Sequence, residues 1–254
     1  MIGGFLDFFT NFCLKFGHIT FILPIVLVLM IFDRRDVYAK ATCFLLWVMI
    51  FNTLLKHLFK VPLLPHLGSG YAFPSGHMHA ACAFYGYILY KTDKNFLKIG
   101  LAALLCCFGF SLIHCHFHDL KDVMGAAGFA FAEFVTYHEL SNKFGDKVVG
   151  FISIVSAVAF MIALGIIFRV EFHVWLAFYG LVGMESALYF FPQESLKSVT
   201  KKLFALLLSG AMIAAVYYVF KALAFDKFYL SEIRFLIFPW AIVGAIRASK
   251  RAKI

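Results

Sequence analysis

Two short stretches of this 254-residue chain carry residues that could do chemistry. The first, residues 71–79, reads Tyr-Ala-Phe-Pro-Ser-Gly-His-Met-His and runs into an apolar segment. Proline suits the first turn of a helix, so we expect Pro74 there. A helix start with Ser75 and Gly76 offers unpaired N–H groups that favour an anion, and His77 follows as a proton donor. Taken alone, the stretch also fits a simple helix-initiating loop.

The second stretch, residues 111–122, contains a histidine and an aspartate four positions apart at a predicted helix start. That spacing puts His118 and Asp122 on one face. An aspartate that accepts from one ring nitrogen fixes the tautomer and leaves the other nitrogen as a nucleophile. A histidine from another helix, His77, could then act as general acid to a leaving group. The plainer alternative is a structural hydrogen-bonded pair.

Together the two stretches resemble the type 2 phosphatidic acid phosphatase (PAP2) superfamily. Its motifs are Lys-x6-Arg-Pro, Pro-Ser-Gly-His and Ser-Arg-x5-His-x3-Asp. Residues 74–77 match the second motif in full, and Ser111, His118 and Asp122 match the third at its spacing. Lys56 is the best match to the lysine of the first. The resemblance covers residues 41–140 and implies an all-α, polytopic membrane bundle with a PAP2-like core.

The resemblance also implies a mechanism. His118 would attack phosphorus to form a phosphohistidine while Asp122 holds its ring. His77 would protonate the leaving alkoxide and then activate water. The phosphate oxygens would be held by Lys56, Ser75, Gly76 and Ser111. The implied reaction uses no metal or other cofactor, and its substrate is a lipid phosphate or diphosphate entering from the membrane.

The chain departs from the family pattern at two positions. Leu63 and Leu112 stand where the first and third motifs have arginine. Arginine clamps phosphate oxygens with a planar fork, which matters where charge develops in the transition state. Other cationic or imidazole side chains could take part, although none has that geometry: Lys60, Lys121, His57, His114 and His116.

Two other functions stay open. Imidazoles and a carboxylate in the two stretches could bind Zn or Fe in a metal-dependent membrane enzyme: His77, His79, His114, His116, His118 and Asp119. Alternatively, the chain keeps the PAP2 fold as a lipid-binding or transport protein without catalysis, which Leu63 and Leu112 would favour.

Composition places the chain in a membrane. It is 63% hydrophobic and only 15% charged, too apolar for a soluble domain of this size. No basic segment precedes the first apolar residues, so we expect no cleavable signal peptide. The six cysteines lie mostly in apolar runs without a CxxC pair and predict neither disulfides nor a thiolate metal site. The basic net charge is expected to follow membrane topology rather than nucleic-acid binding.

Residues 1–16 have helical spacing of phenylalanines and predict an interfacial amphipathic helix. Nine apolar spans follow, each near the length that crosses a bilayer: 17–32, 41–59, 74–90, 96–113, 120–138, 148–168, 174–191, 203–223 and 230–247. Eight is the alternative, since the last span is the weakest. We assign residues 17–168 to the PAP2-like core and 169–254 to additional helices.

Alternating these spans puts 15 of the 23 Lys and Arg on one side of the membrane and eight on the other. The positive-inside rule makes the richer side cytoplasmic. Seven of the ten histidines then lie at exoplasmic helix ends, together with both motif stretches. We therefore expect the site on the exoplasmic side, and we expect an integral protein of a bacterial inner (plasma) membrane with a periplasmic or extracellular site. Glu133 and Glu185 lie within apolar spans, where a carboxyl group is expected to hydrogen-bond to a neighbouring helix.

Overall fold

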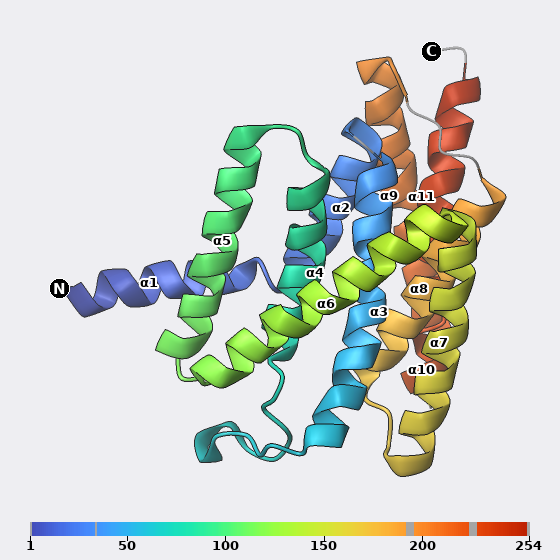
Figure 1. Ribbon diagram of the computed structural model, residues 1–254. Coiled ribbons are helices and arrows are strands. Elements are labelled where there is room, and N and C mark those ends of the chain that lie inside the picture. The colour runs from blue at the N-terminus through green and yellow to red at the C-terminus, as the bar shows by residue number, and fades with distance from the viewer. Residues whose placement is uncertain (1, 34, 192–195, 224–227, 253–254) are drawn as a thin grey trace. The chain divides into compact units, whose positions relative to one another are not determined.

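The computed structural model describes residues 2–33, 35–191, 196–223 and 228–252, and these residues form helices without a strand (Figure 1). In chain order the elements are α1 (Ile2–Lys15), α2 (Ile19–Phe32), α3 (Arg35–Phe59), the 3-10 turn η1 (Pro65–Leu67), α4 (Gly76–Lys91), α5 (Asn95–His114), α6 (Leu120–Phe144), α7 (Asp146–Ile167), α8 (Phe172–Phe190), α9 (Val199–Ala222), α10 (Phe228–Ser231) and α11 (Arg234–Arg251). The predicted all-α class is confirmed.

Eight of the nine predicted spans each overlap one helix, and the ninth, 230–247, covers the end of α10 and most of α11. Among the described residues, five helices are long and apolar enough to cross a membrane: Asp36–Phe59, Asn95–His114, Asp146–Ile167, Val199–Ala222 and Tyr229–Arg251. Counting α1 and α2 together as one broken span gives six. The chain is therefore an integral membrane protein by length and composition of its helices. The count of nine crossings and the interfacial position of residues 1–16 remain predictions.

The chain divides into two compact units, residues 1–23 with 48–146 and residues 24–47 with 147–254. Helix α3 contributes its first half to the second unit and its last three turns to the first. The expected division into a PAP2-like core at 17–168 and additional helices at 169–254 stays a prediction. Within the second unit, α7 contacts the first half of α3, where the Trp47 indole N–H donates to the Ser156 hydroxyl over 2.8 Å.

In the first unit, α4 packs against both α5 and α6, and α1 packs against α5 (Figure 1). Two glycines allow close approach of these elements. A side chain at Gly109 of α5 would meet Val123 of α6 at 3.2 Å, and one at Gly125 of α6 would overlap the ring of Phe73. Gly125 thus lets the loop before α4 lie directly on α6. This arrangement brings residues 71–79 next to residues 118–122.

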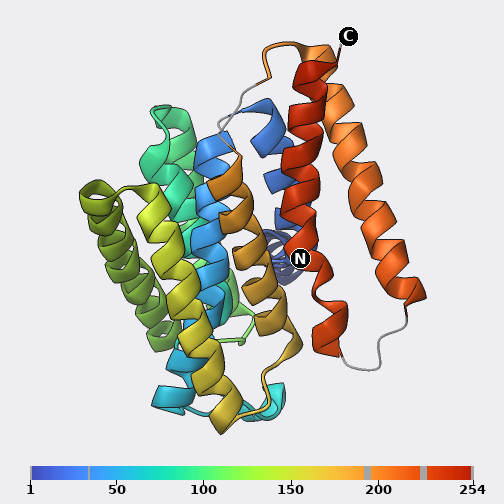
Figure 2. The ribbon, with the colours of Figure 1, turned by 90° about the vertical axis from the view of Figure 1, so that its right-hand side faces the viewer.

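The second unit is built on α11, which packs against α8 and α9 (Figure 2). The Trp240 indole N–H of α11 donates to the Ser186 hydroxyl of α8 over 3.0 Å. A carboxylate oxygen of Glu185 occupies the place of a missing side chain at Gly150 of α7. Because all these contacts lie within the second unit, they bear on its stability rather than on the candidate site.

Candidate functional site

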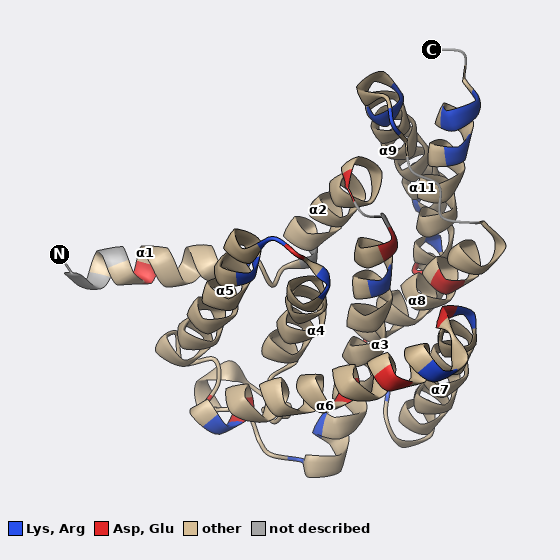
Figure 3. Cartoon of the chain, turned by 45° about the horizontal axis from the view of Figure 1, so that its top comes forward, with Lys and Arg blue, Asp and Glu red and all other residues tan. Residues whose placement is uncertain are grey.

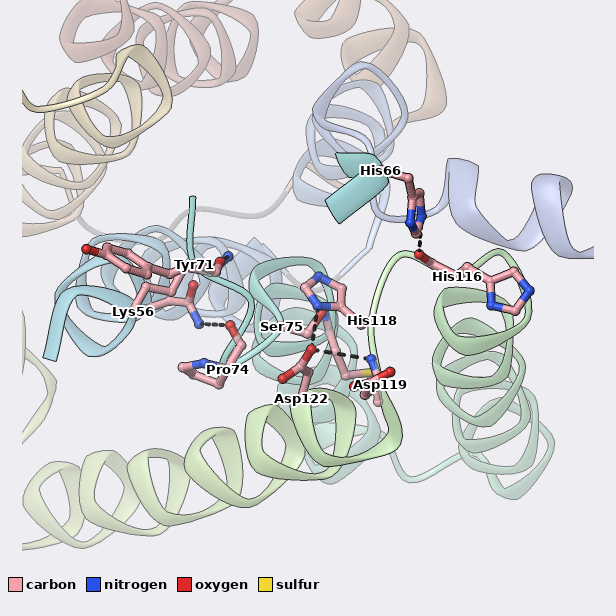
Figure 4. Close-up of polar contacts among 11 residues, drawn as sticks. Lys56, His66, Tyr71, Pro74, Ser75, His116, His118, Asp119 and Asp122 are labelled. Atoms are coloured by element: carbon pink, nitrogen blue, oxygen red, sulfur yellow. Dashed lines mark hydrogen bonds and ion pairs between the residues drawn. The ribbon is translucent and has the colours of Figure 1, made fainter. Parts of the chain in front are cut away.

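A loop of residues 60–75 joins α3 to α4 and folds back on itself. The Ala72 N–H donates to the Val61 carbonyl over 2.8 Å, which returns the chain to the end of α3. As a result the Tyr71 carbonyl lies over α3 and accepts a hydrogen bond from Lys56 Nζ at 2.8 Å (Figure 4). The loop therefore fixes the direction of the one cationic side chain that we expected to bind phosphate.

Helix α4 begins at Gly76, and Ser75 is its N-cap. The Ser75 hydroxyl accepts a hydrogen bond from the Met78 N–H at 3.4 Å, as serine does at helix starts. Pro74 thus precedes the cap and is not in the first turn, contrary to our expectation. The reason is that the Ser75 side chain caps the N-terminus of the helix, so the helix begins one residue after the serine and two after the proline. The Gly76 N–H group lies at the positive end of the α4 dipole.

His118 and Asp122 form the predicted pair. His118 Nδ1 lies 3.1 Å from Asp122 Oδ2, and the two side chains are only 8% exposed. Helix α6 starts after Asp119, and the Asp122 carboxylate also accepts from the Asp119 N–H at 3.3 Å. These two hydrogen bonds lock the carboxylate, which in turn orients the imidazole. With Nδ1 engaged, Nε2 is the ring atom left for nucleophilic attack.

The first stretch meets this pair directly. The Ser75 N–H donates to the Asp122 carbonyl over 3.1 Å, so the cap of α4 is tied to the first turn of α6. Figure 4 shows Ser75, His118 and Asp122 side by side at this junction. At Gly76, a side chain would lie 3.8 Å from Lys56 Cε, so the lysine stem runs past the start of α4. Lys56, Ser75, Gly76, His118 and Asp122 therefore gather at one place, and their roles in binding and catalysis remain predictions.

The electrostatics of His118 favour a neutral imidazole. Burial lowers the pKa of His118 below its usual 6.5, because a charged ring is poorly solvated there. The hydrogen bond to Asp122 raises the pKa and offsets part of that effect, whereas the positive charge of Lys56 lowers it further. A neutral ring at physiological pH has the free electron pair that a nucleophile needs.

Two predicted site residues have other neighbours. His77 is exposed in the first turn of α4, with its ring centroid 6.3 Å from that of His18. The buried Ser111 hydroxyl donates to the Cys107 carbonyl over 2.7 Å and lies within hydrogen-bonding reach of the Cys13 thiol. The general-acid role of His77 and the phosphate-holding role of Ser111 therefore remain predictions.

Leu112, which stands in place of an arginine, is 2% exposed. Its carbonyl accepts from the N–H groups of Phe117 at 3.0 Å and His118 at 3.2 Å. Leu63, the other replaced position, lies in the folded-back loop. The backbone of Leu112 therefore positions the candidate nucleophile, while its side chain brings no charge to the site.

The remaining histidines are dispersed over separate partners. His57 Nδ1 lies 2.7 Å from the Thr53 carbonyl, His114 Nε2 lies 3.1 Å from Asp7, and His66 Nε2 lies 3.0 Å from the His116 carbonyl (Figure 4). Over the described parts of the chain, no three or more His, Cys, Asp or Glu gather as a metal site would require. The metal-enzyme alternative thus has no donor cluster there to build on.

Sequence reasoning missed one residue beside the site. Asn52 of α3 is 4% exposed and contacts both the Pro74 carbonyl, at 3.4 Å, and His79 Nδ1, at 2.9 Å. The only signal was a lone amide in an apolar run four residues before Lys56. Glu133 of α6 lies 2.9 Å from His79 Nε2 on the neighbouring α4, which confirms the expected helix-to-helix hydrogen bond.

Comparison with known proteins adds nothing to this geometry. No family model, curated protein or solved structure matches the chain. The function is therefore inferred from the residues of the site and from the motif resemblance.

Proposed function

We propose that this protein is a membrane phosphatase of the PAP2 type that hydrolyses lipid phosphates through a phosphohistidine on His118. The observation that carries the proposal is the buried hydrogen bond between His118 Nδ1 and Asp122, 3.1 Å long, beside the start of α4. A purely structural pair would have no need of Lys56 and a glycine N–H beside it. Those two groups supply the positive potential that a phosphate requires.

The reaction proceeds in two displacements. The electron pair of His118 Nε2 attacks phosphorus and the bond to the ester oxygen breaks, so the alkoxide leaves and takes a proton from His77. Neutral His77 then removes a proton from water, which attacks the phosphohistidine and releases inorganic phosphate and free His118. Lys56 and the Gly76 N–H stabilise the charge on the non-bridging oxygens in both steps. Asp122 stabilises the ring when it is phosphorylated.

A lipid substrate is favoured by the apolar surface next to the pair. Phe117, Leu120 and Met124 are 41%, 62% and 62% exposed, and they flank His118 and Asp122 in the chain. Exposed apolar side chains at the end of membrane helices suit acyl chains better than water. A phosphate carried by a lipid could therefore reach Lys56 while its chains stay in the bilayer.

The proposed location is the periplasmic side of a bacterial inner membrane. The middle parts of most helices carry no Lys, Arg, Asp or Glu, and the charged residues lie mainly near helix ends (Figure 3). Ser69 and Asp93 are exposed and precede and follow α4, whose crossing would separate them. In a variant without its native cysteines, we expect Ser69→Cys to react with an impermeant maleimide on intact spheroplasts and Asp93→Cys to react only after lysis. Equal labelling of both from outside would contradict this topology.

The direct test is phosphate release by purified protein in detergent from a panel of lipid monophosphates and diphosphates. We expect release of inorganic phosphate from at least one lipid, with equal rates before and after treatment with a chelator. Acid-labile phosphate should be trapped on the protein when the reaction is quenched in base. Activity that disappears with the chelator and returns with a metal ion would replace the phosphohistidine scheme by a metal-dependent one.

A second candidate is a lipid-phosphate binding or transport protein with the same site. The uncharged, buried Leu112 favours it, since the phosphate is left with a weaker clamp than an arginine provides. Saturable binding of a lipid phosphate without phosphate release, in the assay above, would support this candidate over the phosphatase.

A further inference from the structure

A buried hydrogen-bonded chain lies directly behind the candidate site and has no part in the mechanism above. It consists of Asn52 on α3, His79 on α4 and Glu133 on α6. The His79 side chain is fully buried and that of Glu133 is 9% exposed. Three polar side chains from three helices inside a membrane protein are costly to bury unless they hydrogen-bond to one another, and ionisable groups at that depth are candidates for a function. This series of hydrogen bonds ends at the turn that precedes α4, where Asn52 contacts the Pro74 carbonyl.

The contacts of Asn52 assign the orientation of its amide. Nδ2 lies within reach of the Pro74 carbonyl, at 3.4 Å, and of His79 Nδ1, at 2.9 Å. A carbonyl can only accept, so the amide presents its two N–H groups to Pro74 and to His79. His79 Nδ1 must then be the unprotonated ring atom. Its Nε2–H donates to Glu133 Oε2 over 2.9 Å, which gives every member of the chain a defined role.

The other end of the amide touches the anion site. A side chain at Gly76 would meet Asn52 Oδ1 at 3.2 Å, so the amide oxygen lies against the first residue of α4. The His79 N–H also donates to the Ser75 carbonyl over 3.0 Å. Side chain and backbone of His79 are thus both linked to residues 74–76.

We propose that His79, oriented by Glu133, is a positioning residue that acts through Asn52 to hold residues 74–76 in the shape that binds phosphate. This inference rests on the proposed function, because it assigns the second layer of the same site. Glu133 Oε1 is buried and has no hydrogen-bond partner among the described residues, so the carboxylate is directed at His79 alone. His79 does not touch the substrate. It fixes where the Gly76 N–H points.

The sharpest variant is Asn52→Leu, which keeps the approximate shape of the side chain and removes both N–H groups without adding a charge. We expect the inhibition constant of inorganic phosphate and the KM of the lipid to rise by at least about tenfold, the equivalent of one lost hydrogen bond. His79→Leu should do the same. The acid limb of the pH profile, which belongs to His118, should stay in place. Glu133→Gln keeps an acceptor for His79 and should remain closer to wild type than Glu133→Leu.

The matched control is His138→Leu, which removes a histidine from the far end of α6, where it stacks on Phe134. Its phosphate inhibition should equal that of the wild type. If the wild type hydrolyses lipid phosphate but Asn52→Leu and His79→Leu retain its inhibition constant and KM, the positioning role is wrong and the phosphatase stands. If the wild type neither binds nor releases phosphate, the proposed function itself fails.

A measurement on the unaltered protein guards against variants that do not fold. ¹⁵N NMR of histidine-labelled protein, with the His79 signal assigned by comparison with His79→Leu or by backbone correlation, reports which ring nitrogen carries the proton. We expect Nδ1 to be unprotonated and Nε2 protonated. A proton on Nδ1 would reverse the direction of the hydrogen bonds and overturn the inference.

Discussion

His118→Ala is expected to abolish phosphate release, by about four orders of magnitude or more, because it removes the nucleophile itself. No acid-labile phosphate should be trapped on this variant. Asp122→Asn keeps the ring in place but weakens its orientation and charge stabilisation, so it should retain a trace of activity, lower than wild type by about 10²–10⁴-fold. Both effects are measured as kcat with a saturating lipid phosphate and as label retained on the protein.

The control for this pair is His116→Asn, two residues before the nucleophile. His116 has a φ of 54°, a conformation that asparagine tolerates better than alanine, so the backbone is preserved. Only the carbonyl of His116, not its ring, is used in the contact with His66. We expect near wild-type activity. A fully active His118→Ala would remove the phosphohistidine from consideration and leave the pair a structural one.

Lys56→Met should lower kcat/KM by about 10²–10³-fold, because a charge that stabilises the transition state is lost from a partly buried site. It should also change the pH dependence. The neutral form of His118 is the reactive one, and the charge of Lys56 lowers the pKa of His118. Removing that charge raises the pKa, so the acid limb of the kcat/KM profile should move to higher pH. The measurement is kcat/KM between pH 4 and pH 8.

Lys98→Met is the matched control, since it removes one positive charge from the same unit at the opposite end of α5. The helix has 20 residues, so its ends are about 30 Å apart. Screening by salt makes a charge at that distance ineffective. An acid limb that does not move in Lys56→Met, with the rate still reduced, would mean that Lys56 binds substrate without acting on His118.

The helices and the central pair could be predicted from sequence because both depend on local spacing. Apolar runs predict each helix, and an interval of four residues brings His118 to Asp122 without knowledge of the rest of the chain. The number of membrane crossings was harder to predict from the sequence. A helix is recognised by its pattern, but whether it crosses depends on its length and on polar residues such as Glu133 and Glu139 within α6.

What sequence could not provide is the contact between distant segments. Asn52 is one amide in an apolar helix, and only the three-dimensional structure shows that it meets His79 and Pro74. Lys56 donates a hydrogen bond to the Tyr71 carbonyl only because the loop before α4 folds back over α3. Ser111 satisfied the motif spacing, yet its hydroxyl bonds to its own helix. Spacing along a chain fixes which residues are candidates and leaves their directions to tertiary packing.

The length of α4 has a consequence for the membrane around the protein. Its 16 residues span about 24 Å, whereas the hydrocarbon core of a typical bilayer is about 30 Å thick. If Lys91 lies at one interface, Gly76 and the groups around it lie several ångströms below the opposite headgroups. The bilayer must thin there, or the headgroup of a lipid must sink towards α4. Hydrophobic mismatch would then draw the phosphate of a lipid headgroup towards Gly76. A bilayer of lipids with longer acyl chains is thicker, so its headgroups would reach the site less easily.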